Sequence, residues 1–198
     1  MAIVVDKDKK REQIALSCKD LIISSNINSL TISAITKEAG IGKGTFYEYF
    51  KDKDELVFTL VTILMQIYNE KTEAKLKAVK STKEKLKLFA AFYYNKEDSD
   101  LRAIYNQFLA ISILSPDNSM KEFQTECNLK YKDWLKDILQ EGVKNQELPP
   151  QVIEQADGLF IAIKGLYVTY LTTNSIPNLQ EAIDGYLESM YSLMRGLK

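Results

Sequence analysis

The chain has 198 residues, 45% of them hydrophobic, which is enough for one sizeable core or for a small domain and a larger one. Its 26 Lys and Arg residues nearly balance its 27 Asp and Glu residues, so the formal net charge is only −1. The absence of histidine excludes Ser–His and Cys–His nucleophile pairs and the zinc-binding HExxH helix. An enzyme is therefore not expected, and no cofactor or metal site is predicted.

Two features of the sequence bear on the cellular compartment in which the protein is expected. No run of 18 apolar residues occurs, so no membrane span is predicted. Cys18 and Cys127 are far apart and form no CxxC pair, which favours a reducing cytoplasm in which both are buried, inert thiols.

The chain has only 8 Gly and 4 Pro, which favours long helices over many turns. Apolar residues recur at helical spacing along most of it. The predicted fold class is all-α, with nine helices over residues 8–25, 32–39, 43–49, 53–79, 83–95, 101–114, 120–145, 151–172 and 178–195.

The segment GIGKGTFYEYF at 40–50 contains the glycines and lysine of a phosphate-binding loop, but their spacing is wrong for one. A P-loop needs glycine where Lys37 stands and Ser or Thr where Gly44 stands. A dinucleotide-binding loop needs a third glycine at Thr45, and both loops need a preceding strand that the sequence does not predict. A nucleotide enzyme is thereby disfavoured.

A helix-turn-helix explains the same segment better. Gly40 suits the left-handed position that ends a helix, and Gly42 is a tolerable N-cap for the next one. Phe46 and Phe50, four residues apart, are expected to face inward. The second helix of such a motif enters the DNA major groove. The alternative is a helical hairpin with no ligand. The residues expected to face outward are Lys43, Gly44, Thr45, Tyr47 and Glu48.

The charges are distributed slightly unevenly. Through Lys53 there are nine Lys and Arg against seven Asp and Glu, a net charge of +2, and the remaining 17 against 20 give −3. This asymmetry is compatible with a basic DNA-binding head on an acidic body, but it is too mild to establish one.

Residues 10–61 resemble the N-terminal domain of the TetR/AcrR family of transcriptional regulators. The specific part is the pattern T-I-x-x-I-x-K-E-A-G-I-x-K-G-T-x-Y-x-Y-F-K-x-K-x-E-L, which begins at Thr31. The resemblance implies a helix-turn-helix DNA-binding domain over 1–53 and a ligand-binding and dimerisation domain over 54–198.

The resemblance also implies roles for single residues. Thr31 and Tyr47 resemble residues that contact operator phosphates, and Lys53, at the start of a long helix, resembles a further phosphate contact. Lys43, Gly44 and Thr45 would face the major groove.

Two residues depart from the family's pattern. Glu48 places an acid on the DNA-facing side, either to accept a hydrogen bond from cytosine N4 or as a solvated charge that weakens affinity. Thr36 stands where alanine is common, and its hydroxyl is expected to bond back within its own helix.

The last two helices carry a predicted dimer interface. Small residues form a stripe on the helix 151–172, and interior glycines there suggest close backbone approach. The helix 178–195 shows apolar spacing typical of a bundle seam. An intramolecular core is the alternative. The predicted interface residues are Gly158, Ala162, Gly165, Thr169, Ile183, Tyr186 and Met190.

Aromatic residues on the body suit a mostly apolar pocket with a few orienting hydrogen bonds. Ordinary core packing is the alternative for any one of them. The predicted ligand-pocket residues are Phe89, Phe92, Tyr93, Tyr105, Phe108, Tyr131, Trp134, Phe160 and Tyr167.

The sequence thus predicts a homodimeric repressor that a small apolar or amphipathic effector releases from a palindromic double-stranded DNA operator. The alternative function is a small-molecule binding protein whose TetR-like head has weak or no DNA affinity, and an enzyme is the third and least favoured.

Overall fold

The computed structural model describes residues 6–25, 27–114 and 118–197, and every regular element among them is helical. The chain divides into two compact units. Unit 1 contains Met1–Glu70 and Ser99–Lys121, and unit 2 contains Lys71–Asp98 and Glu122–Lys198. No helix in the described ranges is long and apolar enough to cross a membrane. The all-α prediction is confirmed, whereas the functional boundary after residue 53 stays a prediction.

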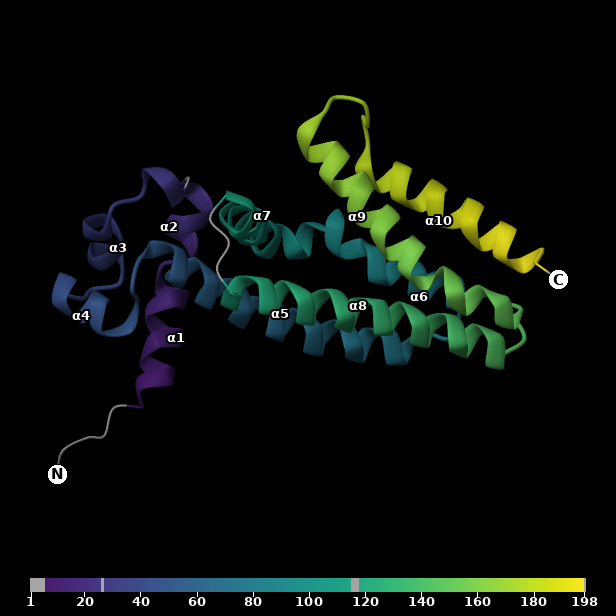
Figure 1. Cartoon of the computed structure of the whole chain (residues 1–198), viewed down its shortest axis with the longest axis horizontal. Helices are drawn as coiled ribbons and strands as arrows, with labels where there is room; N and C mark the ends of the chain where they lie inside the picture. The colour runs from purple at the N-terminus through teal and green to yellow at the C-terminus, as the bar shows by residue number, and fades with distance from the viewer. Residues whose placement is uncertain (1–5, 26, 115–117, 198) are drawn as a thin grey trace. The chain divides into compact units, whose positions relative to one another are not determined.

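Unit 1 is built around the short helices at the N-terminal end of the chain (Figure 1). Its core is formed by Ile14, Ile22, Ile35, Phe46 and Phe108, which are almost completely buried. Its elements are α1 (Lys7–Ser17), α2 (Lys19–Ser24), a 3₁₀ turn (Ile27–Ser29), α3 (Ile32–Glu38), α4 (Lys43–Tyr49), the first part of α5 (Lys53–Ala78) and α7 (Ser99–Leu114).

The predicted single helix over 8–25 is wrong, because the chain breaks at Cys18 into α1 and α2. The hydroxyl of Ser17 donates to the Ile14 carbonyl at 2.8 Å, which competes with the helical ladder at the last turn of α1. The buried Cys18 thiol lies 3.8 Å from the Ile35 carbonyl oxygen of α3. The break therefore coincides with the place where this helix meets α3.

The start of α5 is fixed by side chains that satisfy free backbone N–H groups. Asp52 Oδ1 accepts the Glu55 N–H at 2.9 Å, and Glu55 Oε2 accepts the Lys51 N–H at 2.6 Å. This is close to a capping box, which stabilises a helix N-terminus. Acidic residues in the first turn and lysines in the last turn also match the helix dipole.

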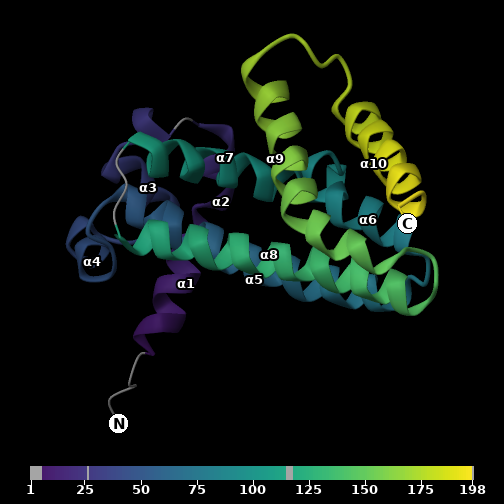
Figure 2. The ribbon, with the colours of Figure 1, turned by 45° about the vertical axis from the view of Figure 1, so that its right-hand side comes forward.

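Unit 2 contains the end of α5, α6, and the helices that follow α7 in the chain, apart from the first turn of α8 (Figure 2). Its core includes Leu86, Leu135, Leu139, Leu159 and Ile163. Its elements are α6 (Thr82–Ala90), 3₁₀ turns at Ala91–Tyr93, Lys96–Asp98 and Pro150–Gln155, α8 (Asn118–Lys144), α9 (Ala156–Thr172) and α10 (Leu179–Arg195).

Two predicted helix boundaries in unit 2 are corrected. The helix predicted over 83–95 ends as an α-helix at Ala90 and continues as a 3₁₀ turn. The helix predicted from 151 becomes α-helical only at Ala156. Pro149 and Pro150 precede it. The chain there forms a hydrogen bond of the 3₁₀ type, in which the Val152 N–H donates to the carbonyl of Pro149, three residues earlier.

Gly142 of α8 lies close to Thr82 at the start of α6. A Cβ at this position would lie 2.7 Å from Thr82 Oγ1, well inside van der Waals contact. Beside this contact the Lys85 ammonium, whose residue is only 5% exposed, forms an ion pair with Glu141. The α6–α8 contact is therefore tightly packed and contains one buried charge.

Candidate DNA-binding and effector sites

The helix-turn-helix consists of α3 and α4, and its local bonds follow the predicted pattern. Thr31 caps α3, accepting the Ala34 N–H at 3.1 Å. Gly40 has φ +63°, the left-handed conformation that ends a helix, and the Ile41 N–H then bonds the Thr36 carbonyl at 3.0 Å. The Thr36 hydroxyl bonds back to the Ser33 carbonyl at 3.2 Å, as expected.

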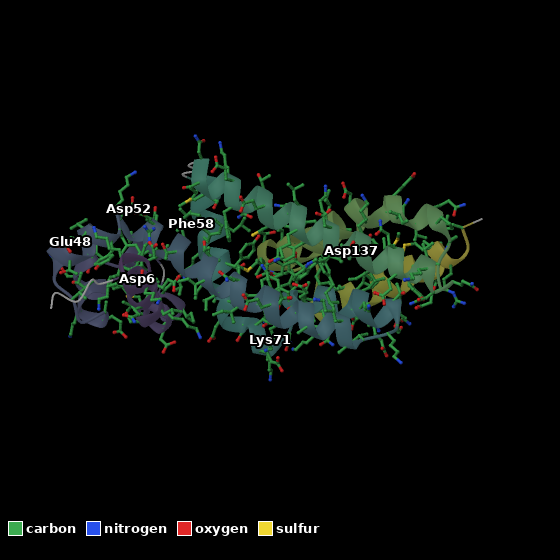
Figure 3. All side chains as sticks on the ribbon, turned by 90° about the horizontal axis from the view of Figure 1, so that it is seen from below. Asp6, Glu48, Asp52, Phe58, Lys71 and Asp137 are labelled. Carbon is green, nitrogen blue, oxygen red and sulfur yellow. The ribbon has the colours of Figure 1, made fainter. Side chains whose placement is uncertain are left out.

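The α4 helix presents its polar side outward. Phe46 and Phe50 are buried, which confirms the predicted inward face. Lys43, Gly44, Tyr47 and Glu48 are exposed, and Thr45 is half-buried (Figure 3, where Glu48 is labelled). The side of α4 that was predicted to face outward is therefore exposed and accessible to a large ligand such as DNA.

The ring of Tyr47 packs against a buried neighbour, while most of its side chain is exposed. Its ring meets the Phe46 ring edge-on, with centroids 5.3 Å apart, yet the residue is 59% exposed. An aromatic side chain that is held at its base and open at its tip can place a phenolic hydroxyl against a phosphate at a fixed position. The phosphate contacts assigned to Tyr47 and Thr31 remain predictions.

Lys53 is placed differently from the sequence expectation of an open phosphate contact. Its ammonium donates to the carbonyl oxygens of Ile27 at 2.6 Å and Leu30 at 3.1 Å. These carbonyls belong to the turn that leads into α3, so Lys53 ties α5 to the helix-turn-helix. A phosphate role for Lys53 stays a prediction and would have to share the ammonium with these carbonyls.

Two side chains outside the predicted set of site residues also hold the head. Arg11 of α1 donates to Glu55 Oε1 at 2.7 Å and lies over the Phe50 ring, 5.2 Å from its centroid. Gln107 of α7 donates to the Ile22 carbonyl at 2.7 Å and accepts the Ile27 N–H at 2.9 Å. No local motif marks either residue, because each acts on chain about 44 or more positions away.

The predicted pocket aromatics fall into two groups. Tyr105 and Phe108 lie on α7 in unit 1, where the Phe108 ring stacks on Phe58 at 5.6 Å. The remaining seven belong to unit 2 and are Phe89, Phe92, Tyr93, Tyr131, Trp134, Phe160 and Tyr167.

The unit 2 aromatics pack as two sets of neighbouring rings. Phe89, Tyr131 and Phe160 are mutual neighbours, with ring centroids 6.2–6.4 Å apart. Trp134 meets Tyr131 edge-on at 5.5 Å. Further rings are paired at 5.0 Å, between Tyr93 and Tyr167, and at 5.3 Å, between Tyr93 and Phe92. We call these seven residues the aromatic cluster.

An open cavity of about 340 Å³ lies beside this cluster in unit 2. Trp134 and Ile138 supply apolar surface there, and Lys77 is among the charged residues of its wall. The volume is at the small end of the range for ligand sites. The full lining is Glu73, Leu76, Lys77, Lys85, Trp134, Asp137, Ile138 and Glu141.

The predicted dimer residues differ in how much surface they offer. Gly158 and Gly165 are exposed, with no atom within 4 Å of a Cβ built on either, whereas Ala162, Thr169, Tyr186 and Met190 are half-buried. Ile183 is completely buried within unit 2, so it has no surface to offer a second copy. Apolar side chains that the prediction omitted, Ile161 and Val168, are 63% and 43% exposed.

A family model for bacterial regulatory proteins of the tetR family matches residues 19–60, which include the whole helix-turn-helix. The fatty acid metabolism regulator protein of Bacillus subtilis is 27% identical over 143 residues, 72% of each chain.

Solved structures share the fold across nearly the full length. A TetR-family transcriptional regulator from Cytophaga hutchinsonii is similar with a TM-score of 0.75 at 19% identity, covering 99% of this chain and 100% of the other. The regulator FadR from Bacillus subtilis, solved with stearoyl-CoA, has a TM-score of 0.63 at 22% identity, covering 94% and 98%. The capped helix-turn-helix thus lies in an N-terminal segment that matches the tetR family, in a chain whose fold is similar to that of TetR-family regulators over nearly its full length.

Proposed function

We propose that this regulator is a homodimeric repressor that binds a palindromic operator through α4 and leaves it when a small, largely apolar ligand binds the body. The observation that carries the proposal is the outward side of α4, where exposed polar residues stand on a buried Phe46–Phe50 base. Such a helix, capped and held by neighbouring elements, suits the major groove.

Dimerisation is supported by the outer side of α9. Gly158, Ile161, Gly165 and Val168 are exposed and follow alternating spacings of three and four residues. That spacing is typical of a helix–helix seam. A second copy of this face would cover apolar side chains that otherwise contact water, and two heads would then read two half-sites.

The effector class is supported by the aromatic cluster and by the relatives. The regulator FadR from Bacillus subtilis was solved with stearoyl-CoA, and a regulator from Saccharomonospora viridis with choline. A cluster of rings with phenolic groups at some edges suits an apolar or amphipathic molecule. Because α5 contributes residues to both units, a ligand that displaces its later turns would also affect its start, where Lys53 holds the head.

DNA binding is tested by fluorescence anisotropy with DNA from upstream of the protein's own gene and with a scrambled fragment of equal length. The proposal expects tighter binding to the upstream fragment, with a midpoint that rises steeply with salt concentration. Equal, weak binding to both fragments would instead favour the alternative of a small-molecule binding protein that has lost its DNA affinity.

A further inference from the structure

One buried polar group of unit 2 has no partner. The side-chain nitrogen Nε2 of Gln124, on α8, is buried and makes no hydrogen bond with any described residue. An unsatisfied buried donor destabilises a folded protein by the full cost of its lost hydration, so it calls for an explanation. One turn later Asn128 donates to the Gln124 backbone carbonyl at 2.7 Å, a bond that does not involve the Gln124 nitrogen.

The same Asn128 binds a lysine that has no counter-ion among the described residues. Lys164 of α9 is partly buried, and its ammonium donates to Asn128 Oδ1 at 3.3 Å. No carboxylate of the described chain lies within ion-pair distance of it, although unit 2 pairs several of its other lysines, such as Lys85 with Glu141. Burial lowers the pKa of Lys164, and the neighbouring Cys127 opposes that shift only in part. A partly buried cation with one weak neutral partner is poorly compensated.

Lys164 adjoins the aromatic cluster. The Lys164 ammonium lies 5.4 Å from the centroid of Phe160, whose ring is a neighbour of both Phe89 and Tyr131. A charged donor is therefore placed at one edge of a largely buried apolar cluster. That is the arrangement that recognises a molecule with a single anionic end and an apolar body.

We propose that Lys164 and Gln124 bind the carboxylate of an amphipathic effector whose apolar body lies against Phe160 and Tyr131. The proposal rests on the proposed function, because it identifies the chemical class of the ligand that would release the DNA. The chemistry is selective for an acceptor, since the Lys164 ammonium and the Gln124 nitrogen are both donors. A carboxylate would supply the charge-assisted hydrogen bonds that both groups lack.

Calorimetry with dodecanoate and 4-phenylbutanoate tests this directly, with dodecan-1-ol and 4-phenylbutan-1-ol as uncharged controls. We expect Lys164→Met to weaken the carboxylates about tenfold or more and the alcohols less than about threefold. Gln124→Leu should also weaken the carboxylates more than the alcohols, but by a smaller factor. Lys164→Arg should retain carboxylate binding. Lys136→Met, at an exposed position of α8, is the matched control and should bind like the wild type.

Thermal unfolding without ligand separates a binding role from a structural one. Gln124→Leu and Lys164→Met remove an unpaired donor and an uncompensated charge, so their melting temperatures should equal or exceed that of the wild type. Binding that is lost together with a lowered melting temperature in both variants would overturn the proposal, because the two groups would then be structural.

The remaining outcomes are also decisive. Failure of both carboxylates to bind the wild type, or equal weakening of acids and alcohols by Lys164→Met, would overturn the proposed site. If another compound nevertheless released the operator, the repressor function would stand without this site. If the carboxylates bound through Lys164 but left DNA binding unchanged, the site would stand and the ligand-released repressor would fail.

Discussion

The ammonium of Lys53 lies 2.6 Å from the carbonyl oxygen of Ile27, which makes this lysine a tie between α5 and the turn before α3. We expect Lys53→Met to lower the free energy of unfolding by about 1–2 kcal/mol, because carbonyls that accept from a charged donor lose it. DNA affinity should fall for every sequence. Chemical denaturation and anisotropy over a range of salt concentrations measure the two effects.

The salt dependence decides between the two roles of Lys53. A tie acts by positioning the head, so the slope of log affinity against log salt should not change. Loss of a phosphate contact would reduce that slope by about one. Lys51→Met, which alters an exposed lysine two residues earlier, controls for general loss of positive charge.

Tyr47→Phe removes only a hydroxyl from a residue that is 59% exposed. We expect operator affinity to fall about tenfold, as for the loss of one hydrogen bond to a charged phosphate, with stability unchanged within about 0.5 kcal/mol. Tyr49→Phe, on the same helix, should bind normally. If Tyr47→Phe binds operator as tightly as the wild type, the hydroxyl contacts no phosphate.

Gly165→Leu tests the α9 interface without the usual ambiguity of a core substitution. A Cβ at Gly165 meets no atom within 4 Å, so the single chain should accept the larger residue. A partner helix packed closely there would be displaced, and sedimentation should then show a folded monomer that binds operator weakly. Asp133→Leu, which adds the same side chain to an exposed position of α8, should remain dimeric. A dimeric Gly165→Leu protein would move the interface elsewhere.

The ion pair between Lys85 and Glu141 predicts a strongly non-additive double-mutant cycle. Glu141→Leu leaves the ammonium of a residue that is only 5% exposed without its partner, and we expect a loss of about 2 kcal/mol of stability. Combining it with Lys85→Met should restore most of the loss, since no charge remains buried. Denaturant midpoints of the two single variants and the double variant measure the coupling between the two side chains. If the stability losses of the single variants simply add in the double variant, the two side chains are not coupled.

Cys127 predicts a loss of stability at alkaline pH. Burial, with a smaller contribution from Glu126, raises the pKa of its thiol to about 11 from an ordinary value of 9.0. Between these values the unfolded thiol ionises while the folded one stays protonated, so the free energy of unfolding falls as pH rises from 9 to 11. The contribution is at most about 2–3 kcal/mol, because the thiol is only partly buried.

Cys127→Ala should remove this pH dependence. The unfolding free energies of the variant and the wild type, measured by denaturant at pH 8, 9, 10 and 11, should converge as pH rises. Other groups that titrate in the same range affect both proteins equally. Curves that stay parallel would mean that the thiol is solvated.

Local signals account for what the sequence predicted well. Gly40, Thr31 and the Phe46–Phe50 pair each act within one or two turns of chain, so their roles can be inferred from spacing alone. The start of α5 at Lys53 follows from capping residues that are adjacent in sequence.

Contacts between distant segments account for the rest. Ile183 and Met190 share one apolar spacing on α10, and only packing shows that Ile183 is fully buried while Met190 keeps some exposure. Similarly, nothing near Tyr105 and Phe108 indicates that they belong to unit 1 rather than to the aromatic cluster. The unpaired Gln124 nitrogen could not be predicted at all, because a missing hydrogen bond has no local pattern.

The bonds of Gln107 to the backbone of residues 22–27 also bear on how such regulators can diversify. Unit 1 takes in Ser99–Lys121 as well as the first seventy residues, so the unit that contains the helix-turn-helix extends beyond the N-terminal part of the chain. A recombination event that exchanged only that part would separate Gln107 from the carbonyls it was selected to bind. Changes of operator preference are therefore expected to arise by point substitution on the outer side of α4 more readily than by exchange of whole heads.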